Sequence, residues 1–104
     1  MSAEILIIDD NADIRLILNE LIEDAGYKIR LAANYNQALT EIDKKLPDVA
    51  IIDVKLDKGD NDGILLLDHI KKKNSDLPVI MISGHANIEM AVSSLKSGAF
   101  EFIK

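Results

Sequence analysis

Three short apolar runs constrain the fold of this chain more than any other feature of its sequence. They cover residues 5–8, 49–52 and 79–82, they are rich in β-branched side chains, and polar residues, glycine or proline bound them. Apolar runs of this length are typical of strands that are buried on both faces, and such strands belong to parallel sheets. Residues 28–31 and 100–103 are weaker strand candidates with similar boundaries, so we predict five strands.

The residues between the strands have the apolar spacing of amphipathic helices. The clearest example places apolar side chains at positions 14, 17, 18, 21, 22 and 25 and ends at Gly26, a residue that suits a left-handed helix cap. A second predicted helix begins after the candidate N-cap Asn34 and ends at Pro47. Two more are predicted: one follows residues 62–63 and runs to the lysines at 71–73, and one begins at residue 88 and stops near residue 98.

Strands and helices therefore alternate along the whole chain in the order (βα)₄β. Short right-handed connections between parallel strands predict an α/β fold with an open, doubly wound five-stranded sheet in the flavodoxin-like strand order 2-1-3-4-5. With 104 residues, the chain has room for one domain. The loop over residues 55–62 is longer than most such connections, and loops of this kind often contain functional residues.

Composition narrows the classes of function. The formal net charge is −6, which disfavours nucleic acid and anionic membranes as direct ligands. The chain has no cysteine, which excludes disulfides, thiolate metal sites and a cysteine nucleophile. It has neither the start of a secretory signal nor a run of about 20 apolar residues that could span a bilayer, so we expect a cytoplasmic protein.

Three carboxylates are expected to meet at one end of the sheet. Asp9 and Asp10 follow the first strand, and Asp53 ends the third. These strands are neighbours in the predicted order, and their carboxyl ends flank the crevice in which such sheets bind ligands. Carboxylates this close cannot all stay ionised without cost, so that one pKa rises or a cation binds. Oxygen ligands with room for water favour magnesium.

A hydroxyl and an open backbone N–H are expected on the same rim. Ser83 and Gly84 directly follow the fourth strand. A phosphoryl group attached to Asp53 would accept hydrogen bonds from both, while magnesium balances its remaining charge. A carboxylate that attacks phosphorus is an ordinary form of covalent catalysis. The residues therefore predict a phosphoacceptor site.

Five segments together resemble the receiver domains of bacterial two-component response regulators over nearly the whole chain. They are residues 5–11, which include Asp9 and Asp10; 47–53; 62–63; 77–84, which end in Ser83 and Gly84; and 96–102, which end in Phe102. Each segment alone is common, but the combination is specific to that family. The loop after Asp53 and residues 81–92 resemble more narrowly the NtrX-type regulators of nitrogen metabolism.

The resemblance implies roles for individual residues. Asp53 would be the phosphoacceptor. Asp10 and Asp53 would bind Mg²⁺ directly, Asp9 would act through water, and the backbone carbonyl of Lys55 would supply a further ligand.

The same resemblance assigns the phosphoryl contacts and the switch. Ser83 and the backbone amide of Gly84 would hold the phosphoryl oxygens. Phe102 falls at the family's aromatic switch position, where the ring turns inward when the serine moves toward the phosphate. Such a domain catalyses only its own phosphorylation and dephosphorylation, so it is not an enzyme in the usual sense.

The resemblance also implies partners outside this segment. A sensor histidine kinase would supply the phosphoryl group, and a longer parent protein would contain an output ATPase module and a DNA-binding domain. The resemblance to receiver domains is also compatible with a homodimer. The family's lysine would follow directly after Lys104, and a fifth helix would follow it, so we expect residues 1–104 to be a receiver domain that stops before its last helix.

Simpler interpretations exist for most of these residues. Asp9 and Asp10 suit a solvated turn or the N-cap of the first helix. Ser83 alone suits a helix cap, and Phe102 alone suits the core. His69 is expected to be exposed, and the lysine run that follows it is expected to be a solvated helix end. His85, two residues after Ser83, lies where it would modulate access to the phosphoryl group, although a loop histidine usually has no such duty.

Four other functions compete with an active receiver. An aspartyl-phosphate phosphohydrolase would need an acid two residues after its nucleophile, where this chain has Asn11 after Asp9. A flavin-binding module would need a hydroxyl- and glycine-rich loop after the first strand, but that loop is acidic here. A Ser–His hydrolase would need a Gly-x-Ser-x-Gly motif, which this sequence lacks. A pseudo-receiver that only binds proteins remains the alternative, and a small phosphodonor would separate the two.

Overall fold

The computed structural model describes residues 3–53 and 62–82 of the chain. Strands and helices alternate in them: β1 (Glu4–Ile8), α1 (Ala12–Asp24), β2 (Lys28–Ala32), α2 (Tyr35–Lys44), β3 (Val49–Asp53), α3 (Asp62–Lys73) and β4 (Val79–Ile82). Each falls where the sequence predicts it, with boundaries that differ by a residue or two. The predicted fourth helix and fifth strand lie outside the described residues.

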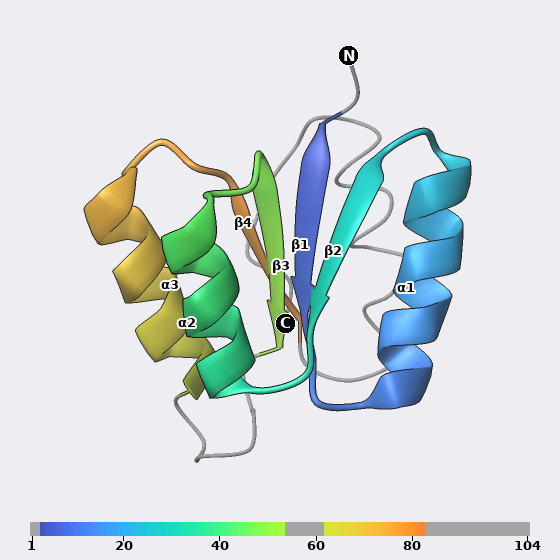
Figure 1. The fold of residues 1–104 in the computed structure, drawn as a ribbon, viewed down its shortest axis with the longest axis horizontal. Helices are drawn as coiled ribbons and strands as arrows, with labels where there is room; N and C mark the ends of the chain where they lie inside the picture. The colour runs from blue at the N-terminus through green and yellow to red at the C-terminus, as the bar shows by residue number, and fades with distance from the viewer. Residues whose placement is uncertain (1–2, 54–61, 83–104) are drawn as a thin grey trace.

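The strands form one parallel sheet in the order β2-β1-β3-β4, which is the predicted order for these four strands. In the register of the sheet, Ile5 lies opposite Ile29 on one side and Val49 on the other. The fold has three layers, because α1 covers one face of the sheet while α2 and α3 cover the other (Figure 1). No helix in the described part of the chain is long and apolar enough to cross a membrane.

The middle strand β1 supplies both hydrophobic cores. Its side chains alternate between the faces of the sheet, so that Ile5 and Ile7 pack in the cluster under α1 while Leu6 and Ile8 pack in the cluster under α2 and α3. All four are 0% exposed. Complete burial of such a side chain stabilises a fold by about 1.5–3 kcal/mol. The strand β1 therefore anchors the sheet, together with β3, which is buried to a similar extent and also contributes to both cores.

The ends of α1 show why the helix begins and stops where it does. Asn11 is its N-cap, and the side-chain Oδ1 of Asn11 accepts hydrogen bonds from the backbone N–H groups of Asp13 (2.8 Å) and Ile14 (3.2 Å). After the helix, Gly26 has a φ of 98°, a conformation that side chains with a Cβ rarely adopt. The predicted left-handed glycine at this end is therefore confirmed.

The start of α2 is held by two reciprocal hydrogen bonds. The side chain of Asn34 accepts one from the backbone N–H of Gln37 (2.8 Å), which confirms Asn34 as the N-cap. The side chain of Gln37 in turn accepts one from the backbone N–H of Ala33 (2.8 Å). The pair differs from a capping box by one residue, because the side chain of Gln37 bonds the N–H of Ala33 and not that of the N-cap Asn34, and together the two bonds fix the turn between β2 and α2.

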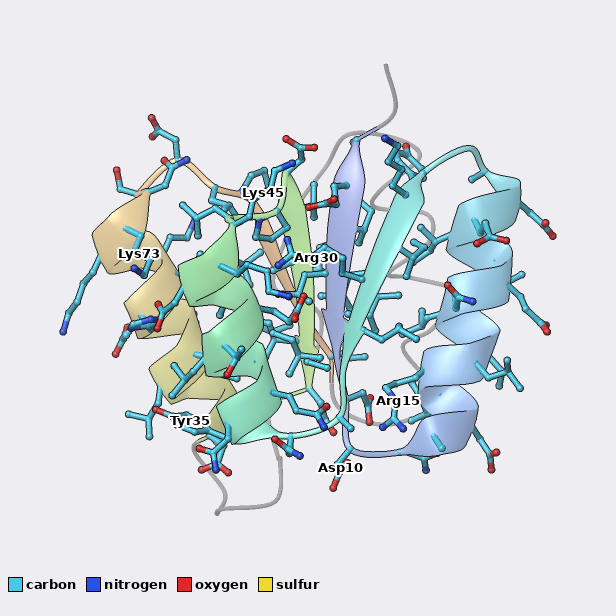
Figure 2. The ribbon with its side chains drawn as sticks, in the orientation of Figure 1. Asp10, Arg15, Arg30, Tyr35, Lys45 and Lys73 are labelled. Carbon is cyan, nitrogen blue, oxygen red and sulfur yellow. The ribbon has the colours of Figure 1, made fainter. Side chains whose placement is uncertain are left out.

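The far end of α2 is tied to the sheet by Arg30 of β2 (Figure 2). Its guanidinium donates to the side chains of Glu4 (2.8 Å) and Glu41 (3.1 Å) and to the backbone carbonyls of Glu41 (2.6 Å) and Lys45 (2.9 Å). The hydrogen bond from Arg30 is the main reason that the pKa of Glu41 lies below its ordinary value. The carbonyl of Glu41 also accepts from the backbone N–H of Lys45 (3.2 Å), so Arg30 adds a second donor there and supplies one to the carbonyl of Lys45, just after the helix.

Two expectations for α3 are corrected. His69 is not simply exposed: it is partly buried, and its Nε2 lies 3.1 Å from Oδ1 of Asp43 in α2, an oxygen that Lys73 also contacts at 3.2 Å. The lysine run is not only a solvated helix end either, since the ammonium group of Lys71 donates to the backbone carbonyls of Ser75 and Leu77. Both contacts hold α3 against its neighbours.

Candidate metal centre

Three carboxylates meet at the carboxyl ends of β1 and β3. Ile8 and Ile52 are paired in the sheet, so the next residues, Asp9 and Asp53, leave neighbouring strands side by side. One carboxylate oxygen from each of Asp9, Asp10 and Asp53 lies within 4.8 Å of the other two. The convergence predicted from the strand order is therefore present. We call these three residues the acidic ring.

Asp9 is the most firmly held member of the ring. Its backbone N–H donates to the carbonyl of Ala32 (3.1 Å), and its carbonyl accepts from the guanidinium of Arg15 (2.7 Å). Its side-chain Oδ1 accepts from the backbone N–H of Asn11 (2.9 Å). Its other oxygen, Oδ2, is buried and has no hydrogen-bond partner among residues 3–53 and 62–82. Asp9 therefore keeps one buried oxygen available for a ligand.

The buried position of Asp9 changes its acidity. The pKa of Asp9 is raised to about 6, mainly by burial, and the charges of Asp53 and Asp10 contribute to the same increase. The backbone N–H of Asn11 and the charge of Arg15 lower this pKa, but they do not compensate for the burial. At neutral pH, Asp9 is thus an ionised carboxylate that is held in place at a cost in stability.

The other two carboxylates differ from Asp9 in exposure. Asp10 is exposed and opens the ring to solvent, whereas Asp53 ends β3 and is partly buried. The interpretation that Asp9 or Asp10 caps the first helix is wrong, because Asn11 fills that position. Because Asn11 caps the helix, helix capping does not explain why three carboxylates lie together here.

A hard divalent cation is the ligand that this ring fits best. All three donors are carboxylate oxygens, and the exposed side at Asp10 leaves room for water. A cation with its bound water would also supply a partner for the buried Oδ2 of Asp9, and it would offset the repulsion among three neighbouring negative charges. The other predicted site residues, Lys55, Ser83, Gly84 and Phe102, lie outside the described residues, as does His85.

Comparison with known proteins decides the family. The model of the response regulator receiver domain matches residues 5–104 of this chain. The chain belongs to the response regulator receiver family. The resemblance given by the sequence motifs is therefore confirmed, and the parallel sheet with the acidic ring at its carboxyl end is the family's fold in this chain.

Several proteins that resemble this chain are NtrX regulators, and the chain spans about a quarter of the length of the full proteins. The nitrogen assimilation regulatory protein NtrX of Azorhizobium caulinodans is 43% identical over 104 residues, which are 100% of this chain and 23% of that protein. Among solved structures, NtrX from Brucella abortus in complex with ATP has a TM-score of 0.76 and 44% identity, and the match covers 99% of this chain and 23% of that one. The isolated receiver domain of NtrX from Brucella abortus has a TM-score of 0.73 and 43% identity, and the match covers 95% of this chain and 82% of that one.

The structure gives two residues near the ring a role that the sequence did not predict. Asn11 served only as evidence against a phosphohydrolase, and its role as the N-cap of α1 was not predicted, although asparagine just before an apolar helical pattern is a typical N-cap signal. Arg15 was overlooked as well, and its spacing alone would not reveal it, because only the turn of the chain after β1 brings its side chain back to Asp9.

Proposed function

We propose that this chain is the phosphoacceptor domain of a two-component response regulator and that Asp53 accepts the phosphoryl group in a magnesium-dependent reaction. The observation that carries this proposal is the acidic ring, in which three carboxylate oxygens lie within 4.8 Å of one another. Membership of the receiver family supports the same role. The ring also has a buried oxygen without a partner, as expected where a cation belongs.

Asp53 suits the acceptor role better than its neighbours in the ring. The side chain of Asp9 is buried and one of its oxygens is already bonded to the backbone of Asn11, so an incoming phosphorus atom has poor access to it. Asp10 is exposed and lies on a loop rather than a strand. Asp53 is the last residue of β3, so the sheet holds its backbone while its side chain faces the ring.

The metal ligands follow from this assignment. Asp10 and Asp53 would bind Mg²⁺ directly, Asp9 would contribute through water, and the backbone carbonyl of Lys55 would complete the protein ligands. When bound, the cation supplies positive charge that neutralises the ring and the incoming phosphoryl oxygens. Asp9, anchored at its backbone and at Oδ1, would hold the water in a fixed place.

Phosphoryl transfer then needs little further chemistry from the protein. A carboxylate oxygen of Asp53 attacks phosphorus and forms a P–O bond, while the P–N bond of a phosphohistidine on the donor kinase breaks. If the donor ring has a proton on its other nitrogen, it leaves as neutral imidazole. Ser83 and the amide of Gly84 would hold the phosphoryl oxygens, and Phe102 would respond to the movement of Ser83.

The output of the switch would lie in a longer protein. This chain spans 23% of the length of the NtrX relative that it matches, and NtrX of Brucella abortus has been solved with bound ATP. We therefore propose that the receiver controls an ATPase module and a DNA-binding domain and so acts in transcription regulation. The net charge of −6 places any contact with DNA in another domain.

Incubation with acetyl phosphate and Mg²⁺, followed by intact-protein mass spectrometry, tests the proposal. The wild-type chain should gain one phosphoryl group, and Asp53→Asn should gain none. Asp68→Asn is a matched control, because Asp68 is an exposed aspartate on α3, and this variant should react like the wild type. Equal modification of Asp53→Asn and wild type would show that the acceptor is a different residue.

The same experiment separates an active receiver from a pseudo-receiver. A pseudo-receiver would remain unmodified in the presence of acetyl phosphate and Mg²⁺ even when the wild-type chain is fully folded. No observation on the described residues favours that alternative, because all three carboxylates of the ring are present and adjacent.

A further inference from the structure

We infer that Arg15 is a positioning residue of the metal centre: it fixes the peptide group between Asp9 and Asp10 and thereby sets where the Asp10 carboxylate enters the ring. This inference rests on the proposed function, since it concerns the site that would bind Mg²⁺. The geometry that carries it is the hydrogen bond of 2.7 Å from a guanidinium nitrogen of Arg15 to the backbone carbonyl of Asp9. Figure 2 shows Arg15 beside Asp10 at this end of the molecule.

The peptide group links Arg15 to Asp10. The carbonyl of Asp9 and the N–H of Asp10 belong to one rigid planar unit, so a bond that holds the carbonyl also fixes the direction of the N–H and the start of residue 10. The other two bonds of Asp9 act on its N–H and its side chain. Of these contacts, only the one from Arg15 restrains the plane that leads to Asp10.

Asp10 depends on this restraint because little else holds it. Its side chain is exposed, and among the described residues no hydrogen bond to its carboxylate is present. Its place in the ring, within 4.8 Å of the other two carboxylates, is therefore set by its backbone. Arg15 is well suited to hold that backbone, because it is partly buried and lies in the first turn of α1, which Asn11 fixes from the other side of the loop.

The charge of Arg15 has the opposite effect from its hydrogen bond. A positive charge near the ring repels a divalent cation, so electrostatics alone predict that removal of Arg15 would strengthen Mg²⁺ binding. Loss of the hydrogen bond would let the Asp9–Asp10 peptide rotate and would weaken binding. The sign of the change in affinity therefore distinguishes a positioning role from a charge effect.

Three substitutions separate the two effects. Arg15→Met removes both the charge and the donor, Arg15→Gln removes the charge and keeps a shorter donor, and Arg15→Lys keeps the charge and a donor. Lys28→Met is the control for loss of one positive charge, because Lys28 is exposed at the amino end of β2, where it pairs with Glu4 at the opposite end of the strands from the ring. Mg²⁺ affinity is measured for each by NMR titration of backbone amides.

Arg15→Met should bind Mg²⁺ about 10-fold more weakly than wild type, the size typical of a lost supporting contact at a metal site. Arg15→Lys should recover most of the affinity, Arg15→Gln should recover part of it, and Lys28→Met should match the wild type. In the absence of metal, the amide signal of Asp10 should move in Arg15→Met. At saturating Mg²⁺, the rate of modification by acetyl phosphate should return close to the wild-type rate.

An affinity of Arg15→Met equal to or tighter than wild type would overturn the inference while leaving the proposed function intact. Wild type that binds Mg²⁺ but is not modified by acetyl phosphate would overturn the proposed function and leave the role of Arg15 standing. If Arg15→Met does not fold, the other two variants decide. Mg²⁺ affinities equal to that of wild type in both Arg15→Lys and Arg15→Gln would refute the inference. An affinity that falls from wild type to Arg15→Lys and again to Arg15→Gln would support it.

Discussion

Arg30 in β2 donates hydrogen bonds to both the side chain and the backbone of Glu41 in α2, at 3.1 Å and 2.6 Å. One side chain thus joins the edge strand of the described sheet to the last turn of the helix that packs on it. Two further bonds from the same guanidinium reach Glu4 in β1 and the carbonyl of Lys45. Arg30 therefore connects three elements at the end of the sheet opposite the acidic ring.

We expect Arg30→Met to lower the free energy of unfolding by about 1–3 kcal/mol, since it leaves partly buried carboxylates and helix carbonyls without their donor. Arg30→Lys should recover only part of the loss, because an ammonium group cannot reach the same spread of acceptors. Urea unfolding measures both values. Lys28→Met, at an exposed position at the start of the same strand, is the control and should change little; an equal effect there would mean that the contacts of Arg30 add nothing.

Asp9→Asn should stabilise the metal-free protein at neutral pH. The pKa of Asp9 is raised to about 6 from 3.8, so the folded state binds a proton more tightly than the unfolded chain, and its stability falls as pH rises from about 4 to 6. Above that window the buried charge costs roughly 1–3 kcal/mol, which asparagine would remove. Thermal unfolding at pH 7.5 and pH 4 should therefore show a gain that shrinks at the lower pH. A gain of the same size at both values would assign the effect to packing.

Asp10→Ala should weaken Mg²⁺ binding strongly and leave the fold intact. Asp10 is exposed, and its side chain has no hydrogen bond among the described residues, so its loss removes a ligand and little structure. Asp13→Ala, another exposed aspartate three residues further along, is the control for net charge. NMR titration gives both affinities, and a mutant at position 10 that binds as tightly as wild type would show that Asp10 is not a ligand.

A fourth prediction concerns one flank of α1. Ile17 and Leu21 are 37% and 43% exposed, next to the buried side chains that face the sheet. We propose that the family's fifth helix, which would follow Lys104, covers this flank. Ile17→Ser with Leu21→Ser should then cost little stability in the 104-residue chain and reduce any self-association.

In a chain extended through that helix, the same double substitution should cost more, because both side chains would then be buried. Thermal unfolding and light scattering of the four proteins provide the comparison. Equal costs at both lengths would show that the flank stays uncovered and that the first and fifth helices do not share a face of the sheet.

The strands could be predicted because burial on both faces requires an uninterrupted run of apolar residues in the sequence. Ile5 and Leu6 point to opposite faces, yet both are fully buried, so the run is apolar without alternation and indicates a central parallel strand. The caps at Gly26 and Asn34 were equally predictable, since each position needs a particular backbone or side-chain chemistry. Strand order then places Asp9 beside Asp53.

Contacts between long polar side chains were not predictable in the same way. The chain offers many carboxylates that could pair with Arg30 or His69, and nothing in the spacing shows which partner each will contact. Arg30 meets Glu4 only because β2 lies beside β1, and His69 meets Asp43 only because α2 lies beside α3. Such pairs follow from the completed fold, whereas a buried strand or a helix cap is specified locally.

The central place of β1 also affects how the protein forms during synthesis. Ile5 and its neighbours emerge from the ribosome before their partners in β3, which begin at Val49, and the hydrogen-bonded residues Glu4 and Asp48 are 44 residues apart. Until β1 pairs with β3, the apolar segment of β1 lacks one of its two neighbouring strands. Pairing over so long a separation slows folding, and the exposed segment can associate with other nascent chains. The acidic ring forms only after this pairing, so a newly made chain cannot bring its three carboxylates together before β1 and β3 have paired.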